Sequence, residues 1–255
     1  MSSESLKPEK LAVLIDADNT TAACAQDLLE EIAKYGIASV KRIYGDWSSP
    51  LLSGWRSILL RHALVPIQQF AYTKGKDATD MGLIIDAMDL LYSGHFDGFC
   101  LVSSDSDFTP LASRIRASGR VVYGFGREKT PEAFRQACDR FFYIENLGEA
   151  GKTKNETSAA STETLTDPPD TARPVAKPRQ MDAAIKSLLT KSIKDATDEA
   201  TGWVFVGKIG NVISETRPDF DSRTYGYAKL SGMLRELRGL QFRTDDANRM
   251  YCRKI

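Results

Sequence analysis

Carboxylate side chains recur at three points in the N-terminal half of the chain, each beside a short apolar run. They lie in LIDADNT, KGKDATD and LVSSDSDF, as Asp16 and Asp18, Asp77 and Asp80, and Asp105 and Asp107. Carboxylates brought close together repel one another, and a hard cation relieves this because Mg²⁺ and Mn²⁺ prefer carboxylate and water oxygens. Such a cation lowers the pKa of an attacking water and stabilises charge that develops on a phosphodiester.

A single Asp after a strand is commonly a helix cap or a turn former, and this interpretation fits Asp18, Asp77 or Asp107 taken alone. Three acidic strand ends in one α/β domain instead favour a metal site. Neutral hydrogen-bonding side chains stand beside the acids and suit the orientation of ligands and water. They are Asn19, Thr79, Ser103 and Ser104.

The elements that must position these acids alternate between strands and helices. Residues 11–15 form an apolar run that is typical of a buried parallel strand, and residues 22–35 show helical spacing. Further strands are predicted at 39–47, 65–72, 96–104 and 120–126, with helices near 52–64, 81–91 and 108–117, and a short helix and last strand over 132–147. The pattern predicts an α/β fold with a parallel sheet covered on both faces, whose ligands bind outside the carboxyl ends of the strands.

Composition divides the chain into three parts. Residues 149–180 are rich in Pro, Thr, Ser and Ala and have almost no large apolar side chain, which predicts a flexible linker with a reach on the order of 30 Å. We therefore expect a first domain over 1–148 and a second over 181–255.

Cysteine usage and the lack of long apolar runs argue against disulfide-linked, zinc-binding, secreted and membrane proteins, whereas the charge balance excludes no class. The formal net charge is zero, but residues 1–148 carry 16 Lys and Arg against 19 Asp and Glu, and residues 181–255 carry 13 against 10. The four cysteines are scattered without CxxC pairing, which argues against a disulfide framework or a zinc site. No signal peptide or membrane span is recognisable, so a cytoplasmic protein is expected.

The three acidic segments together resemble the signatures of the NYN branch of the PIN-like nucleases, the LabA-like proteins, over about residues 8–147. The segments are LAVLIDADNT, KGKDATDMGLIIDAMDL and LVSSDSDFTPLASRIRASGRVVYGFG. The resemblance implies a PIN-like fold and a ribonuclease that cleaves RNA endonucleolytically, with Mg²⁺ or Mn²⁺ as cofactor. It implies main metal ligands at Asp16, Asp80 and Asp105, with support from Asp107, Asp86 and Asn19. The family's third motif often has Gly where this chain has Ser104.

Two other functions compete with the nuclease. LIDADNTT also resembles the nucleophile motif of haloacid-dehalogenase-type phosphatases, in which Asp16 would be phosphorylated and Asp18 would act as acid and base. Those enzymes place a Ser or Thr strand end and a Lys where this chain has KGKDATD. The second alternative is a non-catalytic RNA-binding adaptor that keeps the fold.

The C-terminal part shows three helical patterns followed by a hairpin, which is typical of a winged helix. The helices are expected over 181–193, across Ile209 to Ile213, and over about 227–238, with a turn at 245–248. Trp203 is interpreted as a core residue.

This module resembles the OST-HTH/LOTUS domain through Gly202-Trp203, Val206-Gly207, Pro218-Asp219-Phe220-Asp221, Arg223, Tyr225-Gly226-Tyr227 and Lys229-Leu230. The resemblance implies RNA binding, or docking of a protein partner. Candidate RNA contacts are Arg223, Tyr225, Lys229 and Arg235 in this module and Lys76 beside the acidic site. Arg223 has the alternative role of anchoring a turn. The combined hypothesis is that this module captures RNA for cleavage by the acidic domain.

Overall fold

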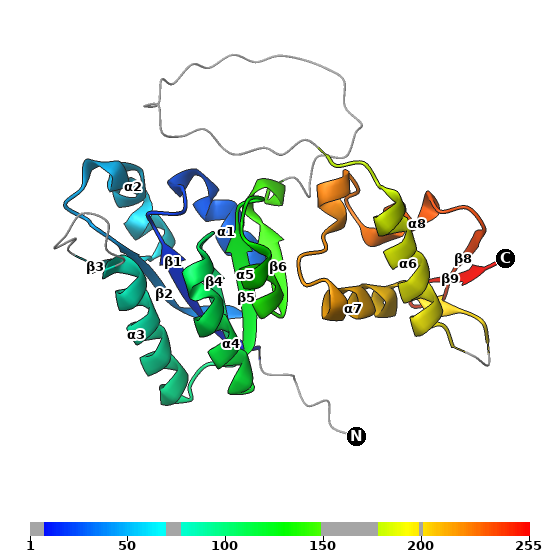
Figure 1. Cartoon of the computed structure of the whole chain (residues 1–255), viewed down its shortest axis with the longest axis horizontal. Coiled ribbons are helices and arrows are strands. Elements are labelled where there is room, and N and C mark those ends of the chain that lie inside the picture. The colour runs from blue at the N-terminus through cyan, green and yellow to red at the C-terminus, as the bar shows by residue number, and fades with distance from the viewer. Residues whose placement is uncertain (1–7, 70–77, 149–177, 199–200) are drawn as a thin grey trace, which may run out of the picture. The chain divides into compact units, whose positions relative to one another are not determined.

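The structure, a computed structural model, describes residues 8–69, 78–148, 178–198 and 201–255. Its described residues fall into two compact units, one that extends to Leu147 and one over 178–255 (Figure 1). The expected linker at 149–180 lies almost wholly outside the described residues, so its boundaries stay a prediction. Each unit is considered by itself.

The first unit is built on a six-stranded parallel sheet with the order β3-β2-β1-β4-β5-β6. Its strands are β1 (Lys10–Asp16), β2 (Ile37–Gly45), β3 (Val65–Gln68), β4 (Gly98–Val102), β5 (Val121–Gly126) and β6 (Arg140–Tyr143). The parallel sheet predicted from the sequence is confirmed. The strand expected at 65–72 is seen as far as Gln68, and residues 70–72 lie outside the described part of the chain.

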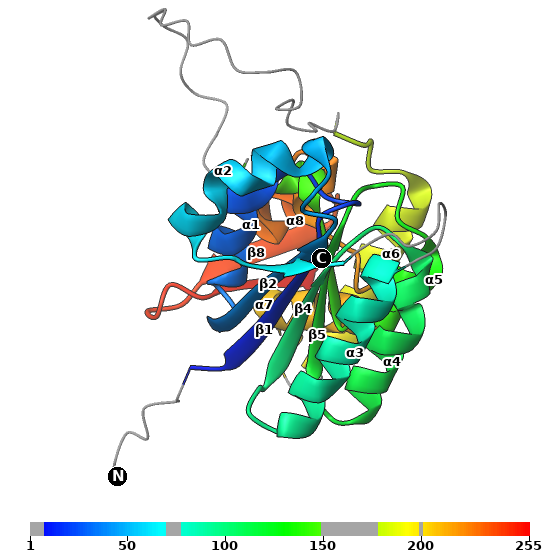
Figure 2. The ribbon, with the colours of Figure 1, turned by 90° about the vertical axis from the view of Figure 1, so that its left-hand side faces the viewer.

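Helices cover both faces of this sheet. They are α1 (Ala25–Ile32), α2 (Ser53–His62), α3 (Ala78–Ser93), α4 (Thr109–Ala117) and α5 (Glu132–Ala137), with short 3₁₀ turns η1 (Ala22–Cys24), η2 (Pro50–Leu52), η3 (Ser106–Phe108) and η4 (Ile144–Asn146). Figure 2 shows α1 and α2 on one face and α3, α4 and α5 on the other.

Strand β1 explains why its sequence is apolar without interruption. Leu11, Val13 and Ile15 pack in the core beneath α1 and α2, while Ala12 and Leu14 pack beneath α3, α4 and α5. All five side chains are fully buried. A strand covered on both faces has no place for alternating polar residues, so its first polar side chain, Asp16, comes where the strand ends.

The strand order reverses direction between β1 and β4. The chain moves outward from β1 to β2 and β3, then returns to β4 on the other side of β1 and continues to β5 and β6. Ile15 pairs with Val102 in parallel register, so both strands end at the same edge. In open α/β sheets this reversal leaves a crevice outside the carboxyl ends of the two strands, where ligands bind.

The second unit contains three helices and a small antiparallel sheet of order β7-β9-β8. Its elements are α6 (Ala183–Ala196), β7 (Val204–Phe205), α7 (Val206–Thr216), η5 (Ser222–Tyr225), α8 (Leu230–Arg235), β8 (Leu240–Thr244) and β9 (Met250–Lys254). This arrangement agrees with the predicted winged helix.

Two details of the second unit differ from the expectation. The sheet gains a third strand because β7 pairs with β9 through Val204 and Phe205. The last helix is shorter than the predicted 227–238, because Lys229 is still extended at φ −143° and ψ 150°, and α8 starts only after it. Within the described ranges, no helix is both long and apolar enough to cross a membrane.

Candidate active site and RNA-contact residues

Asp16 is the most buried carboxylate of the candidate site. It is the last residue of β1, its exposed fraction is 0%, and four donors surround it. Its Oδ1 accepts the backbone N–H groups of Asp18 and Asn19 at 3.1 and 3.3 Å. Its Oδ2 accepts the Asn19 amide and the Ser103 hydroxyl, both at 2.7 Å. The carboxylate is therefore held in one orientation before any ligand binds.

Burial and hydrogen bonding act on Asp16 in opposite directions. Burial raises the pKa of this carboxyl above its ordinary value, while the hydrogen bonds from Ser103 and Asn19 lower it. The neighbouring charge of Asp18 raises the pKa further, and the net effect is upward. The ionised form of Asp16 is thus destabilised, and a nearby cation would stabilise it.

Ser103 connects Asp16 to the third acidic motif. It follows β4, is buried, and accepts the backbone N–H of Asp105 on its hydroxyl at 3.1 Å. Asp105 in turn accepts the backbone N–H of Asp107 at 2.9 Å and caps η3. Asp107 is exposed. The helix cap that the sequence suggests at Asp107 is therefore formed by Asp105 instead. The cap uses only Oδ1 of Asp105, so Oδ2 is available to another partner.

The start of α3 reaches the same group of residues. Thr79, in its first turn, donates its hydroxyl to Asp18 at 3.1 Å, and α3 packs against both β1 and η3. Asp80 lies in this turn and is half-buried. The proposed phosphate-binding Lys76 lies outside the described residues, as does Asp77. The structure therefore brings all three acidic motifs to one edge of the sheet. We call Asp16, Asp18, Asn19, Ser103 and Asp105 the carboxylate edge.

Asp86, expected as a further metal ligand, has other partners. Two turns beyond Asp80 in α3, it pairs with the Arg42 guanidinium and accepts the Tyr44 hydroxyl, both from β2. Arg42 and Tyr44 thus fix the middle of α3 on the sheet, and burial with the Asp86 contact raises the pKa of Tyr44. Among the described residues, Asp86 forms no hydrogen bond or ion pair with the carboxylate edge.

The oxygen atoms at the carboxylate edge are of the kinds that bind a hard cation, because Mg²⁺ and Mn²⁺ prefer oxygen ligands such as carboxylate, amide and hydroxyl groups. Three buried hydroxyls that the sequence did not single out, on Thr20, Thr21 and Thr109, have no hydrogen-bond partner among the described residues. All three closely follow an acidic motif, and each has a free position for water or ligand. Within the described ranges, no three His, Cys, Asp or Glu side chains already stand together as a metal cluster.

Two expected RNA contacts in the second unit take part in its own packing. The Arg223 guanidinium pairs with Asp221, with nitrogen–oxygen distances of 2.7 to 3.1 Å, and both side chains are largely buried. Tyr225 stacks on Phe220 with ring centroids 6.0 Å apart, and burial raises its pKa. Arg223 therefore anchors the η5 turn, which is the second role considered for it.

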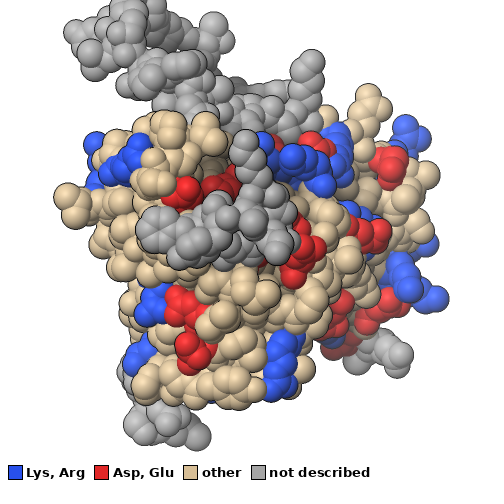
Figure 3. Space-filling view, turned by 60° about the vertical axis from the view of Figure 1, so that its left-hand side comes forward, with Lys and Arg blue, Asp and Glu red and all other residues tan. Residues whose placement is uncertain are grey.

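Lys229 and Arg235 are both exposed, at the two ends of α8. The Arg235 guanidinium lies 5.6 Å from the ring centroid of Phe242. Figure 3 shows acidic and basic side chains interspersed over the face of the molecule that is visible there. Local placement, more than net charge, therefore decides where an RNA phosphate meets a cation.

Solved structures that are similar to this chain include the following two. A crystal structure of a protein of unknown function from Vibrio parahaemolyticus is 22% identical, covers 56% of this chain and 96% of its own, and has a TM-score of 0.45. A solution NMR structure of an uncharacterized protein from Nitrosomonas europaea is also 22% identical, covers 40% and 92%, and has a TM-score of 0.27. No curated protein matches the chain.

Comparison with protein families is more specific. Residues 176–251 match the OST-HTH/LOTUS domain, which supports RNA binding by the second unit. Residues 10–145 match the NYN domain, which is part of the PIN-like nuclease superfamily, and nucleases of this kind typically use divalent metal ions. The two matches together support a nuclease that acts on RNA. The NYN match spans more than half of the sequence and contains the whole carboxylate edge, and so the chain belongs to the NYN domain family.

Proposed function

We propose that this protein is a metal-dependent ribonuclease that hydrolyses RNA phosphodiester bonds endonucleolytically at the carboxylate edge. The observation that carries the proposal is the position of Asp16 at the carboxyl end of β1, where the strand order reverses toward β4, buried and linked through Ser103 to Asp105. A buried carboxylate with a raised pKa beside other acids is a frequent mark of a functional site.

The residues of the edge have separable tasks in this proposal. Asp16 and Asp105, with Asp80 and Asp107 beside them, supply carboxylate oxygens for Mg²⁺ or Mn²⁺. The chemistry that such an ion would supply when bound is activation of a water and neutralisation of charge on the phosphodiester. Ser103 and Asn19 favour the ionised form of Asp16, which burial opposes, and they fix the orientation of its carboxylate, because both donate to it. Asp86 is left out of the ligand set, since Arg42 and Tyr44 bind its carboxylate.

The phosphatase alternative lacks support from the geometry. An aspartyl nucleophile must reach the phosphorus atom of its substrate. Asp16 is fully buried, and each of its carboxylate oxygens accepts two hydrogen bonds, so attack on phosphorus would require the whole carboxylate to move to the surface. Binding of a cation would require only that one of these donors give way. The NYN match points in the same direction.

The test is cleavage of end-labelled single-stranded RNA by the full chain in Mn²⁺, in Mg²⁺ and in EDTA. Asp105→Asn is compared with Asp97→Asn, a matched control at the opposite end of the same strand, where Asp97 accepts the backbone N–H of Lys10. We expect metal-dependent cleavage that Asp105→Asn abolishes and Asp97→Asn retains. Cleavage that survives Asp105→Asn would place the chemistry elsewhere.

A second candidate is an RNA-binding adaptor without turnover. It is favoured by the four donors on Asp16 and by the lack of a ready-made cluster of three acids among the described residues. Calorimetric titration with Mn²⁺ separates the two functions. The nuclease predicts binding that weakens in Asp105→Asn, whereas the adaptor predicts no dependence on Asp105.

A further inference from the structure

The small sheet of the second unit has two faces of opposite character. One cross-strand row, Val204, Cys252 and Phe242, packs into the core of the unit. The adjacent row must point away from that core, because successive side chains of a strand alternate between faces. That outward row consists of Phe205, Tyr251 and Arg243.

Two further side chains join the outward row. Trp203 comes two positions before Phe205, and Arg253 comes two positions after Tyr251, so both lie on the same side of the sheet as the outward row. The Arg253 guanidinium is 4.8 Å from the Trp203 ring centroid. The Arg243 guanidinium is 4.4 Å from the Trp203 ring centroid and 5.4 Å from that of Tyr251. We call Trp203, Phe205, Arg243, Tyr251 and Arg253 the wing face.

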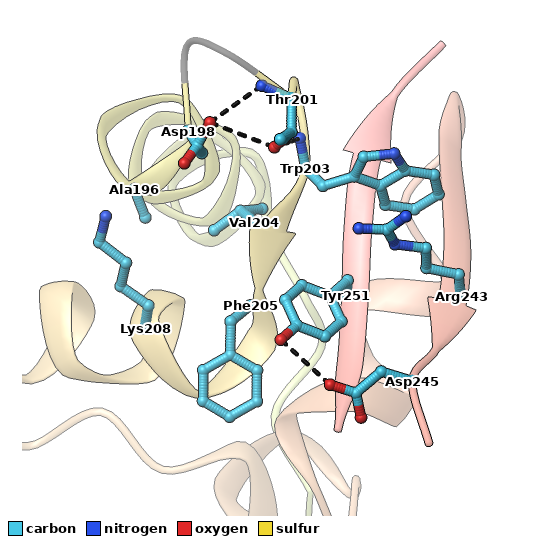
Figure 4. A pocket seen from close by; sticks show the side chains of 10 residues that line it. All are labelled: Ala196, Asp198, Thr201, Trp203, Val204, Phe205, Lys208, Arg243, Asp245 and Tyr251. Atoms are coloured by element: carbon cyan, nitrogen blue, oxygen red, sulfur yellow. Dashed lines mark hydrogen bonds between the residues drawn. The ribbon is translucent and has the colours of Figure 1, made fainter. Parts of the chain in front are cut away.

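The wing face borders a pocket of about 420 Å³ (Figure 4). Lys208 from α7 also lines this pocket, and the Phe205 ring is 39% exposed. Figure 4 shows the rings of Trp203 and Tyr251 on either side of the Arg243 guanidinium. Aromatic rings and planar cations are thus presented together at an open surface, where an apolar core would have hidden them.

The cations of the wing face are not neutralised by the acids around them. In the part of the chain that the structure describes, neither Arg243 nor Arg253 forms an ion pair, and Arg253 donates to the neutral amide of Gln241 at 2.9 Å. Two acids line the pocket wall, and both already have partners. Asp245 is bound by Arg249 at 2.8 Å and by Tyr251, and Asp198 accepts the backbone N–H and the hydroxyl of Thr201. The surface therefore keeps a positive charge for a ligand.

We propose that the wing face is a stacking platform for the unpaired bases and phosphates of single-stranded RNA. Exposed aromatic rings and guanidinium planes stack on the faces of unpaired bases, and the cations attract the phosphates. A duplex hides its base faces in its own stack and so fits this surface less well. The proposal rests on the proposed function only in taking RNA as the ligand, and it does not depend on cleavage.

The wing face also accounts for a difficulty with the contacts predicted from the sequence. Arg223 is bound to Asp221, and Tyr225 is stacked on Phe220, so neither presents a free group to RNA. The wing face offers the same two chemistries, an arginine and an aromatic ring, at the surface.

The first experiment measures RNA binding by the full chain in EDTA, where metal-dependent cleavage is suppressed. An oligouridylate is compared with an abasic oligoribophosphate of the same length and charge. A stacking platform predicts at least about five-fold weaker binding of the abasic strand, since each stacked base contributes measurably to affinity. Equal binding of the two strands would overturn the proposal, because attraction to phosphate alone would then explain the affinity.

Variants locate the contact on the protein. Arg243→Gln with Arg253→Gln is compared with Lys186→Gln with Lys191→Gln, which removes two exposed cations from α6 in the same unit. We expect about ten-fold or greater loss of oligouridylate affinity from the first pair and less than about three-fold from the second. Equal losses from the two pairs would overturn the proposal.

Tryptophan fluorescence gives a readout that misfolding does not imitate. A base stacked near Trp203 should quench its emission, and Trp203→Phe should remove this quenching while keeping most of the affinity, since a ring remains. Quenching that persists unchanged in Trp203→Phe would overturn the proposal.

The outcomes also separate this proposal from the nuclease. Wild-type affinity in the arginine pair, together with metal-dependent cleavage, would overturn the wing face and leave the nuclease standing. Binding that depends on the wing face, without any cleavage in Mn²⁺, would support the platform and contradict the nuclease.

Discussion

The carboxylate edge and the wing face both lie on β-sheets, yet they present their polar groups in opposite ways. At the carboxylate edge, acids stand at the ends of parallel strands, and the central one, Asp16, is fully buried. On the wing face, cations and aromatic rings lie across the flat side of an antiparallel sheet, where the two arginines and Phe205 are exposed and Trp203 and Tyr251 are half-buried.

The difference follows from what covers each sheet. Helices cover both faces of the parallel sheet, so polar chemistry can leave it only where the strands end. The antiparallel sheet packs one face on its helices and leaves the other free, which suits a long, flexible ligand. The carboxylate edge, with its buried central acid, suits the binding of an ion and of the reacting atoms. The wing face, which is open, suits the binding of an RNA strand.

The sharpest way to break this comparison is Asp16→Asn. Loss of the central carboxylate should lower RNA cleavage at least about 100-fold, because substitution of mere outer partners of a metal already costs about 10- to 100-fold. Affinity for oligouridylate in EDTA should stay unchanged, since the wing face is untouched. Cleavage rates and fluorescence anisotropy check the two halves. A parallel loss of RNA affinity would show that the two regions are not separable.

The second test compares how tightly each region is packed. A Cβ on Gly126, at the end of β5, would lie 2.5 Å from the backbone oxygen of Ser103 and 2.6 Å from the Thr130 hydroxyl. Gly126→Ala should therefore destabilise the first unit by about 3 kcal/mol and reduce cleavage. The control is Gly239→Ala before β8, where φ is +79° and a Cβ meets no atom within 4 Å.

That control should cost only about 1 kcal/mol, through the left-handed backbone conformation alone. Urea unfolding followed separately for each unit measures both changes. Equal losses would contradict the view that the carboxylate edge depends on close packing more than the sheet that carries the wing face.

How far the sequence leads also differs between the two regions. The sequence predicts both the parallel sheet and the position of the acidic motifs at one edge of it. The signal is two apolar runs, one that ends at Asp16 and one that ends at Val102, just before Asp105. Such runs have one simple explanation, a strand buried on both faces. The sequence did not reveal that Asp86 is bound by Arg42 and Tyr44, because those partners are more than 40 positions away and on another element.

The wing face is harder to foresee. The sequence predicts Trp203 to be a core residue, because large aromatic residues in a small domain are usually buried, whereas in the structure it is half-buried on the wing face. The alternation of Tyr251, Cys252 and Arg253 was a usable signal, but β7 has only two residues, Val204 and Phe205. Which side of such a short strand faces out depends on its pairing with β9, which the sequence does not show.

A smaller effect is expected from removal of one donor at the carboxylate edge. Ser103→Ala takes a hydroxyl from the Asp16 carboxylate, which should cost about 1 kcal/mol at neutral pH. The hydroxyl lowers the pKa of Asp16, and burial raises it more strongly, so the folded pKa stands above the ordinary value of 3.8. Stability from this group therefore falls as pH rises above 3.8.

In Ser103→Ala the pKa of Asp16 should rise further, so the loss of stability should be small in acid, where Asp16 is protonated, and larger at neutral pH. Thermal unfolding of the variant and the wild type from acid to neutral pH measures this loss of stability. Ser106→Ala, an exposed position in η3, is the control and should follow the wild type at every pH. A constant loss across pH would show that the hydroxyl does not act through the Asp16 charge.

The smallest expected effect concerns the salt dependence of RNA binding and divides the two regions most directly. Each phosphate contact on a single strand adds about 0.7 to the slope of log affinity against log salt. Loss of Arg243 and Arg253, which have no ion pair within the described residues, should therefore make the slope shallower by about 1.4. Asp16→Asn should leave the slope as it is, because a buried carboxylate at the strand ends contributes no cation to the RNA backbone. Anisotropy titrations in EDTA at several salt concentrations measure both slopes. If Asp16→Asn changed the slope as much as the arginine pair did, phosphate capture would extend to the carboxylate edge, and the division between an enclosed site and an open face would fail.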